Sequence, residues 1–152
     1  MSRARVVTGA ARAVARLAKQ VEVAIAPLDL SLPQYRVLAL LGDGSTASSV
    51  LARQLAVSPP TVTAVVDGLV ARSLVERRPD PEDRRRLTLL LTRDGKRVLA
   101  AADAAGETRL EEIAGGLQRD GLDDGPDALA AGLERWSIAL DRNREQRVRR
   151  EA

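Results

Sequence analysis

The chain has no cysteine and no histidine among its 152 residues. Without cysteine, neither a disulfide framework nor a thiol redox switch can form. Without either residue type, a zinc site would need carboxylates alone, and a Ser–His or Cys–His catalytic pair cannot be assembled. These absences remove most hydrolytic chemistry, and the sequence predicts no metal, no cofactor and no enzymatic activity.

Aromatic side chains are also scarce, since Tyr35 and Trp136 are the only two. No stretch reaches the 18 apolar residues of a membrane span, and the arginine-bearing N-terminus lacks the continuous apolar segment of an export signal. The expected compartment is therefore the cytoplasm. The length predicts a single domain, residues 1–152, with a core large enough to fold if association assists it.

Charge is distributed unevenly along the chain, although the net charge is only +3. Lys and Arg outnumber Asp and Glu by 7 to 3 in residues 1–60 and by 9 to 6 in residues 61–100. The balance reverses to 3 against 9 in residues 101–140, and residues 141–152 carry 5 against 3. A polyanion would thus meet faces of opposite sign. A run of like charges alone is more often only solvated surface. It indicates a nucleic-acid contact only where it coincides with a binding motif.

Residues 47–71 predict two short helices joined by a tight turn. Apolar residues recur at helical spacing in both: Leu51, Ala52 and Leu55 in the first, and Val62, Val65, Val66, Leu69 and Val70 in the second. Ser58-Pro59-Pro60 is a strong helix start, because the serine oxygen can accept an orphan N–H and proline at the first position has none to lose. The turn is expected at Ala56 and Val57, and the second helix at about Pro59 to Arg72.

A hairpin is predicted next, with strands at Leu74–Arg77 and Leu87–Leu91. Residues 78–86 between them contain two prolines and four arginines, which do not favour a regular ladder. Helix, turn, helix and arginine-tipped hairpin are the order in which a winged helix-turn-helix meets DNA.

At these residues the chain resembles the MarR family of bacterial transcription regulators. The segments that carry the resemblance are Leu51-Ala52, Ser58-Pro59-Pro60-Thr61-Val62-Thr63, Val66-Asp67-Gly68-Leu69, Leu74-Val75-Glu76-Arg77, Asp80-Pro81-Glu82-Asp83-Arg84-Arg85 and Leu91-Thr92-Arg93-Asp94-Gly95. Each is weak alone, but all occur in order at the right spacing. The resemblance covers roughly residues 30–100 and implies a mainly α fold with a small β-wing. It also implies a homodimeric repressor that binds pseudo-palindromic double-stranded DNA and is relieved by a small-molecule effector.

The winged lobe is expected at about residues 30–92, and the helices at about 3–26 and 93–149 are expected to form a dimerisation base. Val7, Ala10, Val14, Leu17, Val21 and Ile25 form one apolar stripe, and Leu129, Leu133, Trp136 and Leu140 form another. Residues 115–126, rich in Gly and Asp, predict a break between helices of about 93–114 and 126–149. Because neither stripe has an obvious partner in so small a lobe, interleaving of two chains is favoured over an intramolecular bundle. The predicted dimerisation residues are Val7, Val14, Leu17, Val21, Leu129, Leu133, Trp136 and Leu140.

The predicted DNA-contacting residues come from the second helix and the wing. Opposite its apolar face, the helix should present Pro60, Ala64, Asp67, Gly68 and Ala71, with Thr61 and Thr63 at the flanks and free N–H groups at its start. Many family members have arginine where Ala64 and Gly68 stand, so the usual guanine readers are missing. The resemblance assigns Arg85 to the minor groove, Arg84 to the backbone and Asp83 to orienting them. The predicted set is Ser58, Pro59, Pro60, Thr61, Thr63, Ala64, Arg84, Arg85 and Arg86.

Three further residues carry separate expectations. Asp67, which DNA would repel, is expected to cap or to pair with Arg53, Arg72 or Arg77 within the lobe rather than to contact a base. Ser73 stands where the family has glycine before Leu-Val, in a left-handed conformation that costs serine about 1 kcal/mol. Tyr35 is a candidate for lining an effector cleft, although an ordinary core contact is the favoured interpretation.

Two alternatives to a DNA-binding regulator stay open at this point. Gly42-Asp43-Gly44 follows an apolar run and fits a dinucleotide fingerprint, which would make the chain a nucleotide-binding enzyme. Against it, Ser31-Leu32-Pro33-Gln34 predicts that the apolar run is a helix, with Gly42 as its left-handed cap. The other alternative is a winged-helix module that binds proteins and not DNA.

Overall fold

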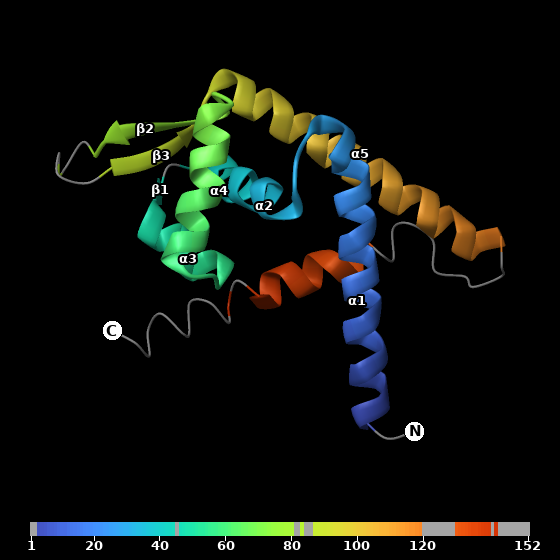
Figure 1. Ribbon diagram of the computed structural model, residues 1–152. Coiled ribbons are helices and arrows are strands. Elements are labelled where there is room, and N and C mark those ends of the chain that lie inside the picture. The colour runs from blue at the N-terminus through green and yellow to red at the C-terminus, as the bar shows by residue number, and fades with distance from the viewer. Residues whose placement is uncertain are drawn as a thin grey trace. The chain divides into compact units, whose positions relative to one another are not determined.

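The structure, a computed structural model, describes residues 3–44, 46–80, 83, 87–119, 130–140 and 142. The chain divides into two compact units, Met1–Glu107 and Thr108–Ala152. The first unit contains the whole winged lobe (Figure 1). None of the helices in the described ranges combines the length and hydropathy that a membrane span requires.

The first unit begins with helix α1 (Arg3–Ile25), a 3-10 turn η1 (Ala26–Leu28) and helix α2 (Leu32–Gly42). The predicted helix start at Ser31 is confirmed as a full capping box. The Gln34 N–H donates to Ser31 Oγ at 3.3 Å, and the Ser31 N–H donates to Gln34 Oε1 at 2.9 Å. The expectation that Gly42 is a left-handed cap is wrong: Gly42 is still helical, and Gly44 has the positive φ, +149°.

The nucleotide-binding interpretation of Gly42-Asp43-Gly44 is also wrong. The fingerprint requires a strand before the glycine-rich turn, so that a phosphate can lie on the next helix. Here the preceding apolar run is α2, and Val37, Leu38 and Leu41 point into the core.

Helices α3 (Ser48–Leu55) and α4 (Pro59–Ala71) form the predicted helix-turn-helix. The chain turns at Ala56, whose φ of 54° is left-handed, and the Val57 N–H donates to the Ala52 carbonyl at 3.1 Å. Arg36 of α2 caps the end of α3 by donating to the Leu55 carbonyl at 3.2 Å. The predicted turn at residues 56 and 57 is therefore confirmed.

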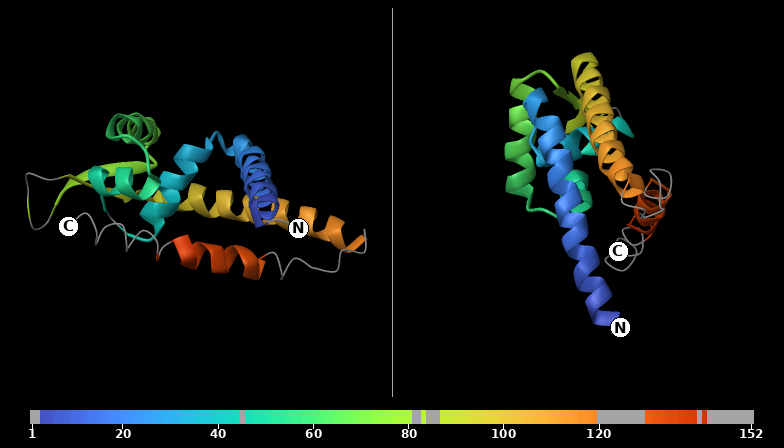
Figure 2. Two further views of the ribbon diagram at one scale, coloured as in Figure 1. Left: turned by 90° about the horizontal axis from the view of Figure 1, so that it is seen from below. Right: turned by 90° about the vertical axis from the view of Figure 1, so that its right-hand side faces the viewer.

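Strands β1 (Thr46–Ala47), β2 (Val75–Pro79) and β3 (Leu87–Leu91) form one antiparallel sheet in the order β1-β3-β2. The β2–β3 ladder runs from Val75 opposite Leu91 to Pro79 opposite Leu87, two residues further than predicted. Proline is tolerated there because β2 is an edge strand and Pro79 is its last residue. The hairpin projects from the helices of the lobe (Figures 1 and 2).

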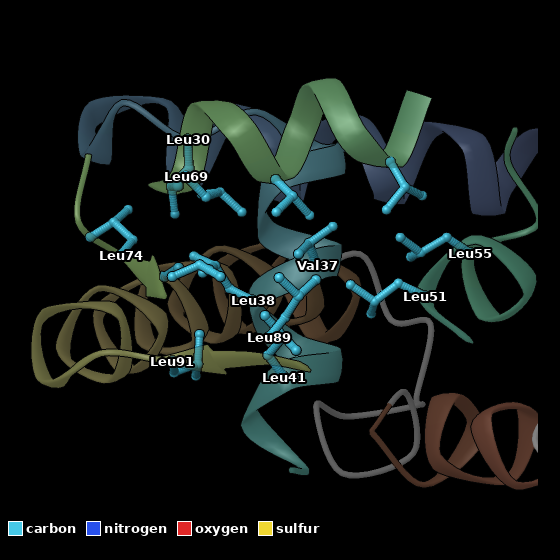
Figure 3. Packing of buried hydrophobic residues seen from close by; sticks show 14 of the residues in the cluster. Leu30, Val37, Leu38, Leu41, Leu51, Leu55, Leu69, Leu74, Leu89 and Leu91 are labelled. Atoms are coloured by element: carbon cyan, nitrogen blue, oxygen red, sulfur yellow. The ribbon is translucent and has the colours of Figure 1, made fainter. Parts of the chain in front are cut away.

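The core of the lobe lies where the helices α2, α3 and α4 meet the sheet. Figure 3 shows Val37, Leu38, Leu51, Leu69 and Leu89 pointing toward one another from these elements. All five are at most 1% exposed. Burying such a side chain contributes about 1.5 to 3 kcal/mol each, so this cluster fixes the mutual positions of the three helices and the hairpin.

Helix α5 (Arg93–Arg119) begins in the first unit and continues into the second. Thr92 caps it, because Thr92 Oγ1 accepts the Gly95 N–H at 2.9 Å. The predicted break at Gly115 is wrong, since α5 continues through Gly115 and Gly116 to Arg119. Glycine in a helix costs about 1 kcal/mol but does not by itself end it.

The rest of the predicted break, residues 120–126, lies outside the described residues. In the second unit, residues 130–140 are helical, within the predicted helix at 126–149.

Candidate nucleic-acid interface

Helix α4 has one buried face and one exposed face, in the predicted helical phase. Val62, Val66 and Leu69 are at most 1% exposed. The exposed face carries Pro60, Thr61, Thr63, Ala64, Asp67 and Ala71. Gly68 differs: it is half-buried, and a Cβ there would lie 3.6 Å from Gln34 Nε2 of α2. Gly68 therefore faces the lobe more than solvent.

Within α4 the first turn offers no free backbone N–H, so the phosphate site expected there is reduced to the N–H of the preceding Ser58, which has no hydrogen-bond partner among the described residues. Pro59 and Pro60 have no N–H at all. The Thr61 N–H donates to Ser58 Oγ at 3.4 Å, and the Val62 N–H donates to the Ser58 carbonyl at 3.2 Å. The same residues that make a strong helix start thus remove or occupy three of its four terminal N–H donors.

Side-chain hydroxyls at this end of α4 are largely engaged as well. Ser58 Oγ and Thr61 Oγ1 form a hydrogen bond of 2.7 Å, in which either atom can donate. Thr63 Oγ1 donates to the Pro59 carbonyl at 3.0 Å. Of the three hydroxyl hydrogens of Ser58, Thr61 and Thr63, two are therefore donated within the protein. One hydrogen of the Ser58–Thr61 pair remains for a ligand.

Asp67 forms an ion pair with Arg77 of β2, with 2.5 Å between Oδ1 and Nη2. This confirms the expectation that Asp67 pairs within the lobe. The next arginine of β2, Arg78, forms an ion pair with Glu76, with 2.6 Å between Nη2 and Oε1. Both arginines of the strand are thus neutralised by carboxylates, and the first pair ties α4 to the wing.

From the sequence, Arg53 is expected only as a possible partner for Asp67. It is exposed on α3, and within the described part of the chain its side chain takes part in no hydrogen bond or ion pair. The first helix of a helix-turn-helix crosses the DNA backbone, so an unpaired cation there suits a phosphate. The sequence could have indicated this phosphate contact, because Arg53 lies on the first helix of the predicted helix-turn-helix, shortly before the Ser58 start of the second helix.

The wing tip is described only in part. Arg84, Arg85 and Arg86 lie outside the described residues, so their predicted roles stay predictions. Asp83 is exposed, and its N–H donates to Asp80 Oδ1 at 3.2 Å. Its predicted role in orienting the arginines is likewise untested.

The end of α4 is held by contacts to two other parts of the lobe. Arg72 donates to the Leu28 carbonyl at 3.2 Å and to the Asp29 carbonyl at 2.5 Å, at the corner between α1 and α2. Ser73 has the predicted left-handed conformation, with φ of 56°. Its carbonyl accepts the Thr92 hydroxyl at 2.7 Å. These contacts fix the position of the C-terminal end of α4 and the direction in which the chain continues from it into β2.

Tyr35 lies on α2, half-buried, and its hydroxyl donates to Asp103 Oδ1 of α5 at 2.7 Å. Burial raises the pKa of the Tyr35 hydroxyl, and the Asp103 hydrogen bond and the negative charges of Asp103 and Glu107 raise it further. The hydroxyl therefore stays protonated and keeps donating. Tyr35 also packs against the core, in line with the ordinary contact favoured for it, although its hydroxyl is paired rather than left to solvent.

The predicted dimerisation stripe of α1 is exposed in its first part only. Residues 9–16 are all exposed, with Val14 at 60%, whereas Val21 packs against the core of its own chain. Leu17 is intermediate, and the side chain of Val7 lies outside the described ones. The C-terminal part of this stripe thus has a partner within the chain, which the sequence interpretation did not foresee.

The second unit exposes the other predicted stripe. Leu133, Trp136 and Leu140 are 36%, 69% and 57% exposed, and Leu129 lies outside the described residues. A tryptophan with more than half its surface in water is unusual for a folded chain without a partner on that face.

Comparison with known proteins gives one consistent result. The model of the MarR family matches residues 28–86. The transcriptional regulator HosA of Escherichia coli O111:H- is 37% identical over 90 residues, which cover 59% of this chain and 67% of that protein.

Two solved structures are similar in fold as well. RV1404 from Mycobacterium tuberculosis superposes with a TM-score of 0.74 and 28% identity, covering 90% of this chain and 96% of that one. CouR from Rhodococcus jostii RHA1, solved bound to p-coumaroyl-CoA, gives a TM-score of 0.63 and 25% identity, covering 75% and 86% of the two chains. The chain therefore belongs to the MarR family of winged helix-turn-helix transcriptional regulators, which bind DNA and are not enzymes.

Proposed function

We propose that this regulator is a homodimeric repressor that binds a pseudo-palindromic duplex and is released from it by a small molecule. The observation that carries the DNA-binding part is the exposed face of α4 on the same rigid lobe as the projecting hairpin. A helix enters the major groove with one face, while a hairpin beside it reaches the neighbouring minor groove.

In this proposal each part of the lobe has one role. Pro60, Thr61, Thr63 and Ala64 face the bases, while Ser58 and Pro59 set the start of the helix. Arg85 enters the minor groove, Arg84 and Arg86 contact phosphates, and Asp83 orients them. Arg53 is added as a phosphate contact from α3. A narrow minor groove attracts a planar guanidinium, so affinity depends more on the wing than on α4.

The dimer is supported by the two exposed apolar stripes. Residues 9–16 of α1 and residues 133–140 expose Val14, Trp136 and Leu140, which solvent does not favour. A two-fold axis would bury each stripe against the partner's and would place two α4 helices one helical turn apart on the duplex. The proposal also treats residues 1–152 as a single domain that folds together with these helices.

Release by a small-molecule effector is supported only by the similarity of this chain to CouR, whose structure was solved bound to p-coumaroyl-CoA. Tyr35 is a weak candidate for such a site, since its hydroxyl is already taken by Asp103. A ligand at this position would contact the ring rather than the hydroxyl.

The proposal is tested by selecting duplexes from a random-sequence library with the full-length protein. We expect enriched sequences with two inverted half-sites, and tight binding of those duplexes at physiological salt. Enrichment of no duplex, with capture of a protein partner instead, would establish the protein-interaction module and reject DNA binding.

A further inference from the structure

Helix α4 has an unusually small set of hydrogen-bond donors where it would meet bases. Among the described residues at its exposed start, no backbone N–H within α4 is free, and the remaining donors are the N–H of Ser58, before the helix, and one hydroxyl hydrogen of the Ser58–Thr61 pair. The exposed face carries no Lys or Arg, and Asp67 is an acceptor already paired with Arg77.

Methyl groups are what this surface offers instead. Ala64 ends in a methyl group, and Thr63 has one beside a hydroxyl whose hydrogen is used on the Pro59 carbonyl. Both side chains are exposed on consecutive positions of α4. Thr63 can therefore give a base only a methyl contact or an acceptor oxygen.

The four base pairs respond differently to such a surface. Guanine presents two acceptors in the major groove, O6 and N7, and needs two donors to replace the water it loses. Thymine presents a methyl group, which gains by contact with alanine or with the threonine methyl. A surface poor in donors thus disfavours G·C pairs and favours A·T pairs.

We propose that Thr63 and Ala64 read thymine methyl groups, so that α4 selects A·T pairs where it enters the major groove. This inference rests on the proposed function and adds the base that the helix recognises. It also separates two tasks within the lobe: the arginines supply affinity, and two methyl-bearing side chains supply the choice of base.

The test removes the DNA methyl group alone. In the best duplex from the random-sequence selection, each thymine is replaced in turn by uracil, which differs only by that methyl. We expect one or two thymines per half-site at which the exchange weakens binding about fourfold, equivalent to about 0.8 kcal/mol for one buried methyl group.

Protein variants then show which side chain reads which thymine. At its own thymine, Thr63→Ser or Ala64→Gly should bind the thymine and uracil duplexes equally. Each variant is compared with itself on two duplexes, so any loss of stability cancels. Thr108→Ser, the same change at an exposed position of α5, should keep the full discrimination.

A rescue adds an independent arm. Changing a sensitive T·A pair to C·G should weaken binding, and 5-methylcytosine in place of that cytosine should restore part of the loss. If duplexes are selected but uracil exchange has no effect at any position, the inference is wrong while DNA binding stands. Selection of guanine at the positions sensitive to Thr63 and Ala64 would overturn it too. Failure to select any duplex would overturn the proposed function itself.

Discussion

Gly95 lies in the first turn of α5, where the chain passes very close to Leu74, between α4 and β2. A Cβ at this position would overlap the Leu74 carbonyl, which also accepts the Thr92 N–H at 3.1 Å. The last motif of the family resemblance, Leu-Thr-x-x-Gly, thus has a physical explanation. Threonine caps the helix, and glycine leaves room for the carbonyl that the cap residue binds.

We expect Gly95→Ala to destabilise the lobe by about 1 to 3 kcal/mol, because the backbone of Leu74 or of α5 must shift. Urea unfolding, followed by circular dichroism, measures this loss. Gly9→Ala is the matched control, since nothing lies within 4 Å of a Cβ there. The control should gain about 0.5 to 1 kcal/mol, as alanine is the better helix former. Equal stability of both variants would contradict the close approach at Gly95.

Ala64 is the residue at which the base-reading face of α4 can be tested by a gain in DNA-binding affinity rather than by a loss. We expect Ala64→Arg to strengthen binding by about 1 to 3 kcal/mol at half-sites with a guanine opposite it, the value of a bidentate contact. Arginine has nearly the helix propensity of alanine, so the fold should tolerate it. Titration against duplexes with each base pair at that position measures the effect. A gain independent of the base would mean that the arginine reaches only phosphate.

At the scale of elements, helix periodicity predicts α1 and α4 almost to the residue, and the predicted turn at Ala56 and Val57 gives the end of α3 at Leu55. In α4 the apolar stripe and the Ser58 cap agree, so local and tertiary preferences point the same way. Strand β1 was not predicted because two residues, Thr46 and Ala47, are too few for an alternating pattern. Glycine marks neither helix end as predicted: Gly42 is the last helical residue of α2 rather than a left-handed cap, and α5 continues through Gly115 to Arg119, because glycine weakens a helix by only about 1 kcal/mol.

The predicted helical phase of α4 is confirmed except at Gly68, whereas the predicted donors at its start are mostly missing. Counting residues along α4 places Ala64 and Asp67 outward, and the structure agrees. The prolines that mark the helix start also remove donors, so the phosphate site predicted at this end of α4 keeps only the N–H of Ser58. The pairing of Asp67 was predicted from charge, but only the three-dimensional register of β2 singles out Arg77 among three arginines.

The wing, as an element, should supply most of the affinity. We expect Arg85→Ala to weaken binding of the selected duplex by about 1 to 3 kcal/mol per half-site and to leave the oligomeric state unchanged. Titration at fixed salt measures the change. Arg97→Ala, which removes an exposed arginine of α5 that pairs with Asp94, should bind as the parent does. Equal binding by both variants would remove Arg85 from the interface.

At the scale of the whole molecule, we expect dimerisation to link the two exposed stripes to DNA recognition. We expect deletion of residues 127–152 to yield a monomer that no longer binds the selected duplex at concentrations where the full chain is saturated. One lobe holds too few contacts to bind specifically, whereas two lobes share the cost of association. Sedimentation equilibrium gives the mass, and a gel-shift titration gives the affinity. A truncated monomer with undiminished affinity would reject the dimer as the binding unit.

Hydroxyl-radical footprinting of the full-length protein on its selected duplex tests the central claim most directly, because it reports where the backbone is covered. Two α4 helices and two wings on a two-fold axis predict two equivalent protected regions, centred about 10 base pairs apart and related by the symmetry of the site. Each should extend into the adjacent minor groove that a wing covers. A single unpaired region, or two regions without that symmetry, would contradict a dimer reading the duplex through α4 and the wing.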